Sequence, residues 1–387
     1  MTKYAGLALT LISMCHGINH IYYALVPLIV LILAKDQSNL TYGILVSSFL
    51  LTYSFLQTPF GYLSKKLGRK RLLVAGFFTT SFSFLILGFI DNMFLSGLLL
   101  LLAGVGGSTY HPNGVPFLTE FYSEKRGQAT GFHQTGGSIG SVIAPFLLTG
   151  TTLLNLDWRT TLIILSIPGF IASITVWFFL PEQTNPAADA KVLPSKERAR
   201  FNIKLYQNVI FLMLAAVTYN LGTRAIDAFA PRYFKSGRGI SDFDIFFLVS
   251  MLKVAGLFSG PLSGRLSDIF GRKKVLFILI VIESVSTYAI TLISIGSLIL
   301  PCITFGFASF GLLAITDAFM ADIAPKEHMA TFFGIQFTAS FAVGAVIGPV
   351  LGIVADLYNY NLGFTAVSII IPFSIILLTR VQNKDII

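Results

Sequence analysis

The segment from Gly264 to Lys274 reads Gly-Arg-Leu-Ser-Asp-Ile-Phe-Gly-Arg-Lys-Lys and lies between two long apolar stretches. About 200 positions earlier, the segment from Gly61 to Lys70 repeats its pattern as Gly-Tyr-Leu-Ser-Lys-Lys-Leu-Gly-Arg-Lys. Two other stretches recur at nearly the same shift: His16-Gly17-Ile18-Asn19-His20 with Pro27 matches Asn220-Leu221-Gly222-Thr223-Arg224 with Pro231, and Gly140 with Ala144-Pro145 matches Gly344 with Gly348-Pro349. Three matches at nearly one shift predict that the chain consists of two homologous halves.

The composition indicates a membrane protein. Hydrophobic residues make up 54% of the chain, charged residues 12%, and the mean hydropathy is +0.77. Soluble domains carry about 25% charged residues, so a chain this apolar needs a lipid-facing surface. Cys15 and Cys302 both lie in apolar stretches, which excludes a disulfide framework. The first apolar run, to about Ala34, is too long for a signal peptide and is kept as a span.

The apolar runs predict twelve transmembrane helices, because about 20 apolar residues cross a bilayer. The spans are expected at 6–33, 41–63, 72–90, 94–119, 127–150, 160–180, 206–230, 243–263, 275–296, 298–320, 329–356 and 362–380. The longest polar stretch, 181–205, separates six spans from six. We therefore predict an all-α membrane protein with two pseudo-symmetric six-helix bundles, 1–180 and 206–387, joined by a cytoplasmic linker at 181–205.

The cationic residues predict the orientation. With the N-terminus inside, twenty lysines and arginines fall on the cytoplasmic side and five outside, namely Lys35, Arg159, Arg232, Lys235 and Arg238. Short loops rich in lysine and arginine stay in the cytoplasm. We expect both termini in the cytoplasm and the protein in the plasma membrane. This placement accounts for the net charge of +9 without a nucleic-acid partner.

The loop at 264–274 resembles the signature loop of the major facilitator superfamily and follows the eighth span, as it does in that family. The resemblance implies the major facilitator fold and gating roles for the loop and for two glycine–proline bends. The residues concerned are Gly264, Asp268, Gly271, Arg272, Pro145 and Pro349. In the first-half copy, Lys65 stands where the family usually has an aspartate, so only Asp268 can inherit the latch to a neighbouring helix end.

A finer resemblance covers roughly residues 100–150. The stretches Gly104-Val105-Gly106-Gly107-Ser108-Thr109-Tyr110-His111-Pro112 and Gln134-Thr135-Gly136-Gly137-Ser138-Ile139-Gly140, followed by Pro145, are similar to fosmidomycin-resistance-type exporters. That similarity implies proton-coupled export of small, often anionic compounds.

Ionisable residues inside spans are expensive and therefore mark candidate sites. His16 and His20 are four apart on one helix face, and His111 precedes a proline in the fourth span. These histidines are predicted to bind substrate, and His20 also to relay protons; the alternative is helix–helix hydrogen bonding. No cysteine or carboxylate cluster completes the pair His16 and His20, so we expect no metal site.

The second half supplies the opposite wall of the expected cavity. Arg224 occupies the repeat position of His20, and Asp227 lies three residues further on, so the pair can bind an anion and a proton or form a static ion pair. Asp317 is a second candidate proton carrier, while Gln134 and Asn220 complete the predicted substrate-binding set. Lys253 and Glu283 are expected to form a structural ion pair.

These patterns predict a secondary transporter that works by alternating access. We expect proton-coupled export of a small anionic or polar solute by a monomer without a cofactor. The alternatives are a proton-coupled importer of an organic anion and a membrane sensor or scaffold that transports nothing. An enzyme is disfavoured because no H-E-x-x-H pair, serine elbow, cysteine nucleophile or cofactor fingerprint is present.

Overall fold

The computed structural model describes residues 2–121, 126–181, 203–325 and 329–382, and these residues form helices and no strand. The helices of the first half are α1 (Thr2–Leu33), α2 (Asn39–Phe55), α3 (Gln57–Leu67), α4 (Arg69–Leu87), α5 (Met93–Ser108), α6 (Tyr110–Phe121), α7 (Arg126–Leu153) and α8 (Trp158–Phe179). The second half contains α10 (Ile203–Arg232), α11 (Asp242–Phe270), α12 (Arg272–Leu292), α13 (Ile299–Ile323), α14 (Met329–Leu357), α15 (Tyr360–Ile370) and α16 (Phe373–Arg380). A π-helical turn, Tyr233–Gly237, and a 3₁₀ turn, Ile295–Ser297, complete it.

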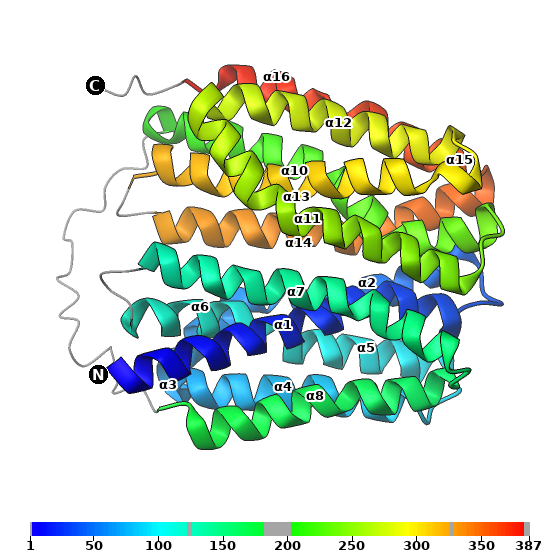
Figure 1. The fold of residues 1–387 in the computed structure, drawn as a ribbon, viewed down its shortest axis with the longest axis horizontal. Coiled ribbons are helices and arrows are strands. Elements are labelled where there is room, and N and C mark those ends of the chain that lie inside the picture. The colour runs from blue at the N-terminus through cyan, green and yellow to red at the C-terminus, as the bar shows by residue number, and fades with distance from the viewer. Residues whose placement is uncertain (1, 122–125, 182–202, 326–328, 383–387) are drawn as a thin grey trace.

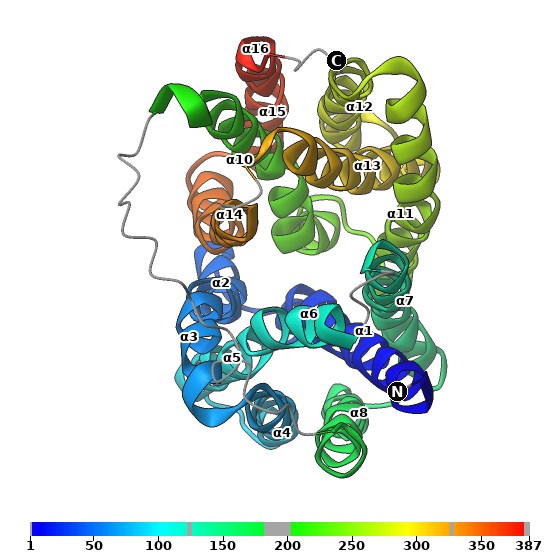
Figure 2. The same cartoon turned by 90° about the vertical axis from the view of Figure 1, so that its left-hand side faces the viewer.

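The described helices agree with twelve membrane spans. Eleven stretches are long and apolar enough to cross a bilayer, and α2 with α3 makes a twelfth that bends by 47°. Figure 2 shows α1–α8 gathered in one bundle and α10–α16 in the other. The predicted fold class is confirmed. Most of the predicted linker, 182–202, lies outside the described residues, so the domain boundaries stay predictions.

One face of the molecule carries the start of α1 and the end of α16, at the left in Figure 1. We call it the terminal face and the opposite one the distal face. On the terminal face, Gly68 between α3 and α4 has φ 84° and Gly271 between α11 and α12 has φ 93°. Residues with a side chain rarely adopt such angles. The two basic loops thus make the same turn in both halves, which is the structural form of the sequence repeat.

The two bundles meet along two helix pairs, α2 with α14 and α7 with α11. At the first pair the backbones nearly touch. A Cβ atom added to Gly43 of α2 would lie 2.6 Å from the carbonyl carbon of Gly348 and 2.8 Å from the nitrogen of Pro349. Small residues allow such close approach of membrane helices. Gly43 is therefore required by the contact between the halves.

The variant Gly43→Ala should destabilise the folded protein, because the new methyl group meets backbone that cannot move aside. We expect a loss of about 1–3 kcal/mol, measured as a lower melting temperature in detergent. Gly150→Ala is the matched control, since a Cβ atom there meets nothing within 4 Å. Equal melting temperatures for the two variants would contradict the close contact.

Candidate functional site

A cavity of about 410 Å³ lies between the two halves on the side of the terminal face. Its walls come from α3, α6 and α14 and include Gln57, Gly61, Lys65, His111, Thr331 and Phe337. Towards the distal face, a separate space lined by Arg224, Asp227 and Lys253 measures only about 30 Å³, which is room for one or two water molecules. The molecule is thus open towards the terminal face and closed towards the distal face.

Arg224 connects the two halves between these two spaces. Its guanidinium is buried, donates from Nε to the carbonyl oxygen of Ser340 at 3.0 Å, and donates from Nη1 to the hydroxyl of Tyr23 at 2.7 Å. It also lies 4.5 Å above the ring of Phe341. Tyr23 belongs to α1 of the first half, whereas Ser340 and Phe341 belong to α14 of the second. The cation is therefore held mainly by neutral groups that a ligand could replace.

Asp227 lies between two cations. Its carboxylate is 3.7 Å from Nη1 of Arg224 and 2.6 Å from Nζ of Lys253. The predicted pairing of Asp227 with Arg224 is present, but the shorter contact is to Lys253 of α11. Charged groups buried this deeply need such partners, because removing one leaves the other uncompensated.

The expected ion pair between Lys253 and Glu283 is wrong. Glu283 is fully buried, and its Oε1 accepts a hydrogen bond from the hydroxyl of Thr223 at 2.8 Å, while its Oε2 has no partner among the described residues. From the sequence we expected Asp227 to pair with Arg224 alone. In the structure Asp227 of α10 is also the carboxylate that pairs with Lys253. Glu283 is left as a buried carboxyl group that faces a hydroxyl instead of a cation.

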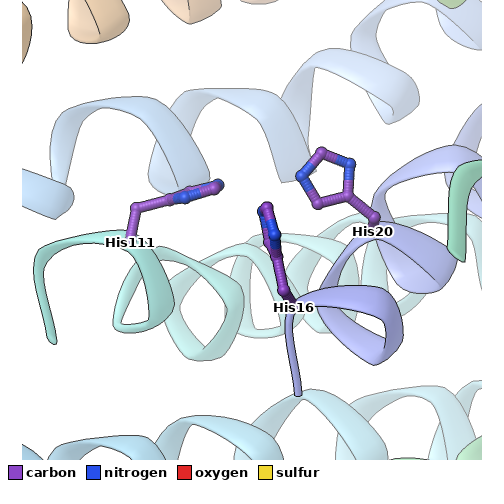
Figure 3. A group of neighbouring side chains, drawn as sticks. All are labelled: His16, His20 and His111. Atoms are coloured by element: carbon purple, nitrogen blue, oxygen red, sulfur yellow. The ribbon is translucent and has the colours of Figure 1, made fainter. Parts of the chain in front are cut away.

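The four histidines of the described residues form one cluster. Figure 3 shows His16 and His20 on α1 next to His111 on α6. The ring centroid of His16 lies 4.6 Å from that of His20 and 5.4 Å from that of His111. The ring of His133 on α7 stacks on the ring of His16 with a centroid distance of 4.1 Å. A Cβ atom on Gly137 would lie 2.6–2.9 Å from the His16 ring, so this glycine makes room for it.

The other predicted binding residues are spread more widely. Asn220 is buried one helical turn before Arg224 and donates to the carbonyl of Ala216 at 2.8 Å, with Ser340 Oγ at 3.4 Å. Gln134 is exposed on α7. Asp317 is partly buried on α13 and makes no hydrogen bond or ion pair to any described residue. Asn220 thus belongs to the Arg224 network, and the structure does not join Asp317 or Gln134 to it.

The predicted gating residues of the second half hold its terminal face together. Arg272 forms an ion pair with Asp268, donates to Ser267 Oγ at 2.7 Å, and pairs through Nε with Asp322 at 3.1 Å. Asp322 lies at the end of α13, so the turn at Gly271 is tied to a neighbouring helix end within one half, whereas Gly264 lies inside α11. Pro145 and Pro349 lie inside α7 and α14, the helices that meet the opposite half.

The distal face is closed by two charged residues that the sequence did not single out. The carboxylate of Asp356, at the end of α14, accepts from the backbone amides of Asn39 and Leu40 at 3.1 and 2.9 Å and from the Asn39 side chain at 2.8 Å. These amides begin α2, and the N-terminus of a helix attracts an anion. Asp356 therefore caps a helix of the opposite half.

Arg232, at the end of α10, makes the complementary contact. It is only 4% exposed, and its guanidinium donates to the carbonyl oxygens of Ala34, Lys35 and Gln37 and to the side chain of Asn39. A cation is favoured at the carbonyls that follow a helix such as α1. Arg232 and Asp356 each stand as a single charged residue at the end of an apolar span. This pattern is the sequence feature that could have indicated the two contacts.

Similar proteins agree with this fold. The family model described as Major Facilitator Superfamily matches residues 9–349 and again 254–385. The chain is 25% identical to the multi-drug resistance efflux pump PmrA of Streptococcus pneumoniae serotype 4 over 86% of this chain and 84% of that protein. It is 28% identical to the multidrug resistance protein MdtG of Proteus mirabilis over 88% and 85% of the two chains. The crystal structure of the nucleoside transporter NupG superposes with a TM-score of 0.79 at 13% identity, over 97% of this chain and 99% of that one.

The chain belongs to the major facilitator superfamily. It is a multi-pass membrane transporter and not an enzyme, as the sequence predicts. The finer resemblance to fosmidomycin-resistance-type exporters stays a prediction.

The revised pairing of Lys253 can be tested with double-mutant cycles on thermal stability. Lys253→Ala with Asp227→Ala should show a coupling of about 0.5–3 kcal/mol, because the two side chains are in contact. Lys253→Ala with Glu283→Gln should be additive, and Glu283→Gln alone should be mild since the amide keeps the shape without a charge. Coupling in the second cycle and none in the first would restore the original pairing.

We call the contacts of Asp356 and Arg232 the distal gate. If this gate keeps the distal face closed, it should limit how fast the native Cys302 reacts, since this residue lines the closed space next to the gate. In a Cys15→Ala background, Asp356→Ala should increase the rate at which a membrane-impermeant maleimide modifies Cys302 several-fold. Asp36→Ala is the matched control, because Asp36 is exposed and its one ion pair with a described residue is with Lys35, at 4.0 Å. Equal rates in the two variants would mean that Asp356 does not hold the distal face closed.

Proposed function

We propose that this transporter exports a small polar organic solute from the cytoplasm in exchange for protons. In this proposal the terminal face lies in the cytoplasm, the protein is in the plasma membrane, and the described structure is the inward-facing state of an alternating-access cycle. The observation that carries the proposal is the Arg224–Asp227–Lys253 network, which lies between an open cavity and a closed gate and contacts both halves. The names of the relatives PmrA and MdtG support export.

The network contains cationic groups and one carboxylate, Asp227, which can bind either a proton or a solute. A solute that donates hydrogen bonds or carries a positive charge can bind the carboxylate of Asp227 in competition with Lys253. A proton on Asp227 removes the negative charge and weakens that binding. Because solute and proton then exclude one another, each crosses in its own half of the cycle, and the proton gradient drives the solute outward.

The aromatic side chains around Arg224 suit an organic solute. The ring of Tyr23 packs against Phe49, Tyr53 and Phe341 with centroid distances of 6.3, 5.3 and 5.7 Å. These rings offer apolar contact next to a few polar groups, which is the usual composition of a small-molecule site.

Arg224 supports a second candidate, the proton-coupled import of an organic anion. A carboxylate or phosphonate can bind a guanidinium through two hydrogen bonds and would replace the contacts of Arg224 with Tyr23 and Asp227. A proton on Asp227 would favour this exchange, because it removes the competing negative charge. Anion and proton would then bind together and cross in the same direction.

Proteoliposomes that contain a pH-sensitive dye distinguish the two candidates. A panel of small organic cations, neutral solutes and anions is added outside. A solute that enters in exchange for protons makes the lumen more alkaline, whereas an anion that enters with protons makes it more acidic. The sign of the pH change does not depend on the orientation of the protein in the vesicle.

The variant Asp227→Asn should abolish the pH change in both cases. For the exporter it should also weaken solute binding at least tenfold, because the amide carries no charge for the solute, whereas the importer should retain anion exchange and lose only its proton. Asp242→Asn is the matched control, since Asp242 forms an exposed ion pair with Lys235 at 2.8 Å. A solute-driven pH change that survives both Asp227→Asn and Arg224→Ala would place the site at Asp317 and the histidines instead.

A further inference from the structure

We propose that His16, His20 and His111 bind a divalent transition-metal ion of the zinc class. One ring nitrogen from each of the three side chains lies within 4.8 Å of the other two. Figure 3 shows the three rings pointing towards one shared space. The proposal does not depend on the direction of transport or on the solute.

The positions of the rings match those of three imidazoles around one ion. The planes of His16 and His20, His16 and His111, and His20 and His111 make angles of 85°, 86° and 89°, with centroids 4.6, 5.4 and 5.9 Å apart. Three imidazoles bound tetrahedrally at about 2.0–2.1 Å have ring centroids about 5 Å apart. The ring centroids are thus close to the spacing of a bound site, and the ring nitrogens, which lie within 4.8 Å of one another, have to turn towards the ion to bind it.

The hydrogen bonds of His16 leave a lone pair for an ion. Its Nδ1 lies 2.9 Å from the carbonyl oxygen of His133, and a carbonyl can only accept, so this nitrogen carries the proton. The lone pair is then on Nε2, which is buried and has no partner among the described residues. A buried nitrogen without a partner is costly, and a metal ion would satisfy it.

His20 has the same tautomer for a different reason. Ser141 Oγ donates its proton to the carbonyl of Gly137 at 3.1 Å, so it accepts from Nδ1 of His20, also at 3.1 Å. Nε2 of His20 then carries a lone pair. The hydroxyl of Tyr53 accepts from Nδ2 of Asn19 at 2.9 Å and lies 3.1 Å from Nε2 of His111, so either tautomer of His111 satisfies this contact. An ion in the shared space selects the tautomer with the proton on Nε2, and Nδ1 of His111 is then the third ligand. Each ring is thus oriented by an outer partner, as histidine ligands of metals usually are.

The same tautomers argue against a site that binds an anion directly through these rings. An anion needs N–H groups that point towards it, whereas His16 and His20 direct lone pairs into the shared space. Three imidazoles without a thiolate or carboxylate favour zinc, cobalt, nickel or copper over magnesium or calcium. His111 also lines the cavity of about 410 Å³, which gives an ion a route from the terminal face.

Spacing along the sequence did not indicate that His111 joins His16 and His20 as a third ligand. The pair His16 and His20 is visible as a four-residue spacing, but His111 joins it only because α6 packs against α1. With three nitrogen ligands, a metal no longer requires a cysteine or carboxylate ligand, because three histidines with an open fourth position are a known zinc arrangement.

The test uses the purified full chain after removal of any polyhistidine tag. Titration with Zn²⁺ by calorimetry, and with Co²⁺ by its visible d–d absorption, should show one saturable site, while Mg²⁺ should show none. His20→Ala and His111→Ala should each lower Zn²⁺ affinity at least tenfold. His133→Phe is the matched control, because it keeps a ring against His16 and the backbone carbonyl that orients it, and it should retain the site.

Zn²⁺ should also raise the melting temperature of the wild type and of His133→Phe but not of the two alanine variants, since a ligand stabilises only a fold that binds it. Melting curves without metal show that each variant is folded. Absence of one-site binding in the wild type, or equal binding in the wild type, the control and both alanine variants, would overturn the proposal.

Discussion

A guanidinium inside a membrane-spanning helix must be satisfied by other protein groups, and the centre of this molecule is organised around that requirement. Arg224 obtains its partners from both halves, with Tyr23 on one side and Ser340, Phe341 and Asp227 on the other. Polar groups are costly in the bilayer interior unless they are paired or hydrated. Any movement of one bundle against the other therefore has to give Arg224 a new partner, and a bound solute or water is the available candidate.

The two faces of the molecule differ in how the bundles are held together. On the distal face, Asp356 caps the start of α2 and Arg232 caps the end of α1, so both contacts cross between the halves. The ion pairs of Arg272 on the terminal face remain within the second half. Opposite charges at opposite helix ends make the distal contacts directional, and a few such bonds can be exchanged without disturbing either bundle. This asymmetry explains how one face is closed while a cavity opens at the other.

The sequence predicted the parts of the structure that repeat or follow a period. The apolar runs located the spans, and the paired basic loops predicted two alike halves, which Gly68 and Gly271 confirm by their matching φ angles. The spacing of His16 and His20 correctly indicated a shared face, and Arg224 with Asp227 form the expected contact. Each of these features lies within a single helix, and the sequence alone shows which residues of a helix share a face.

Contacts between helices were harder to predict. In the sequence, Lys253 could pair with either Asp227 or Glu283. Only the packing of α10 against α11 brings Asp227 into contact with it. The arrival of His111 and His133 beside His16 depends on three helices. The distal gate was missed because Arg232 contacts backbone carbonyls, and backbone groups carry no signature in a sequence.

We infer that the network around Arg224 faces alternate sides of the membrane as the two bundles rock. Double electron–electron resonance tests it most directly, in a variant without native cysteines that carries spin labels at exposed positions. One label pair, at Asp36 and Tyr358, spans the distal face, and another, at Tyr62 and Ile335, spans the cavity on the terminal face. As pH or solute is changed, we expect one distance to lengthen while the other shortens. Distances that change in the same direction, or that stay fixed while transport proceeds, would contradict it.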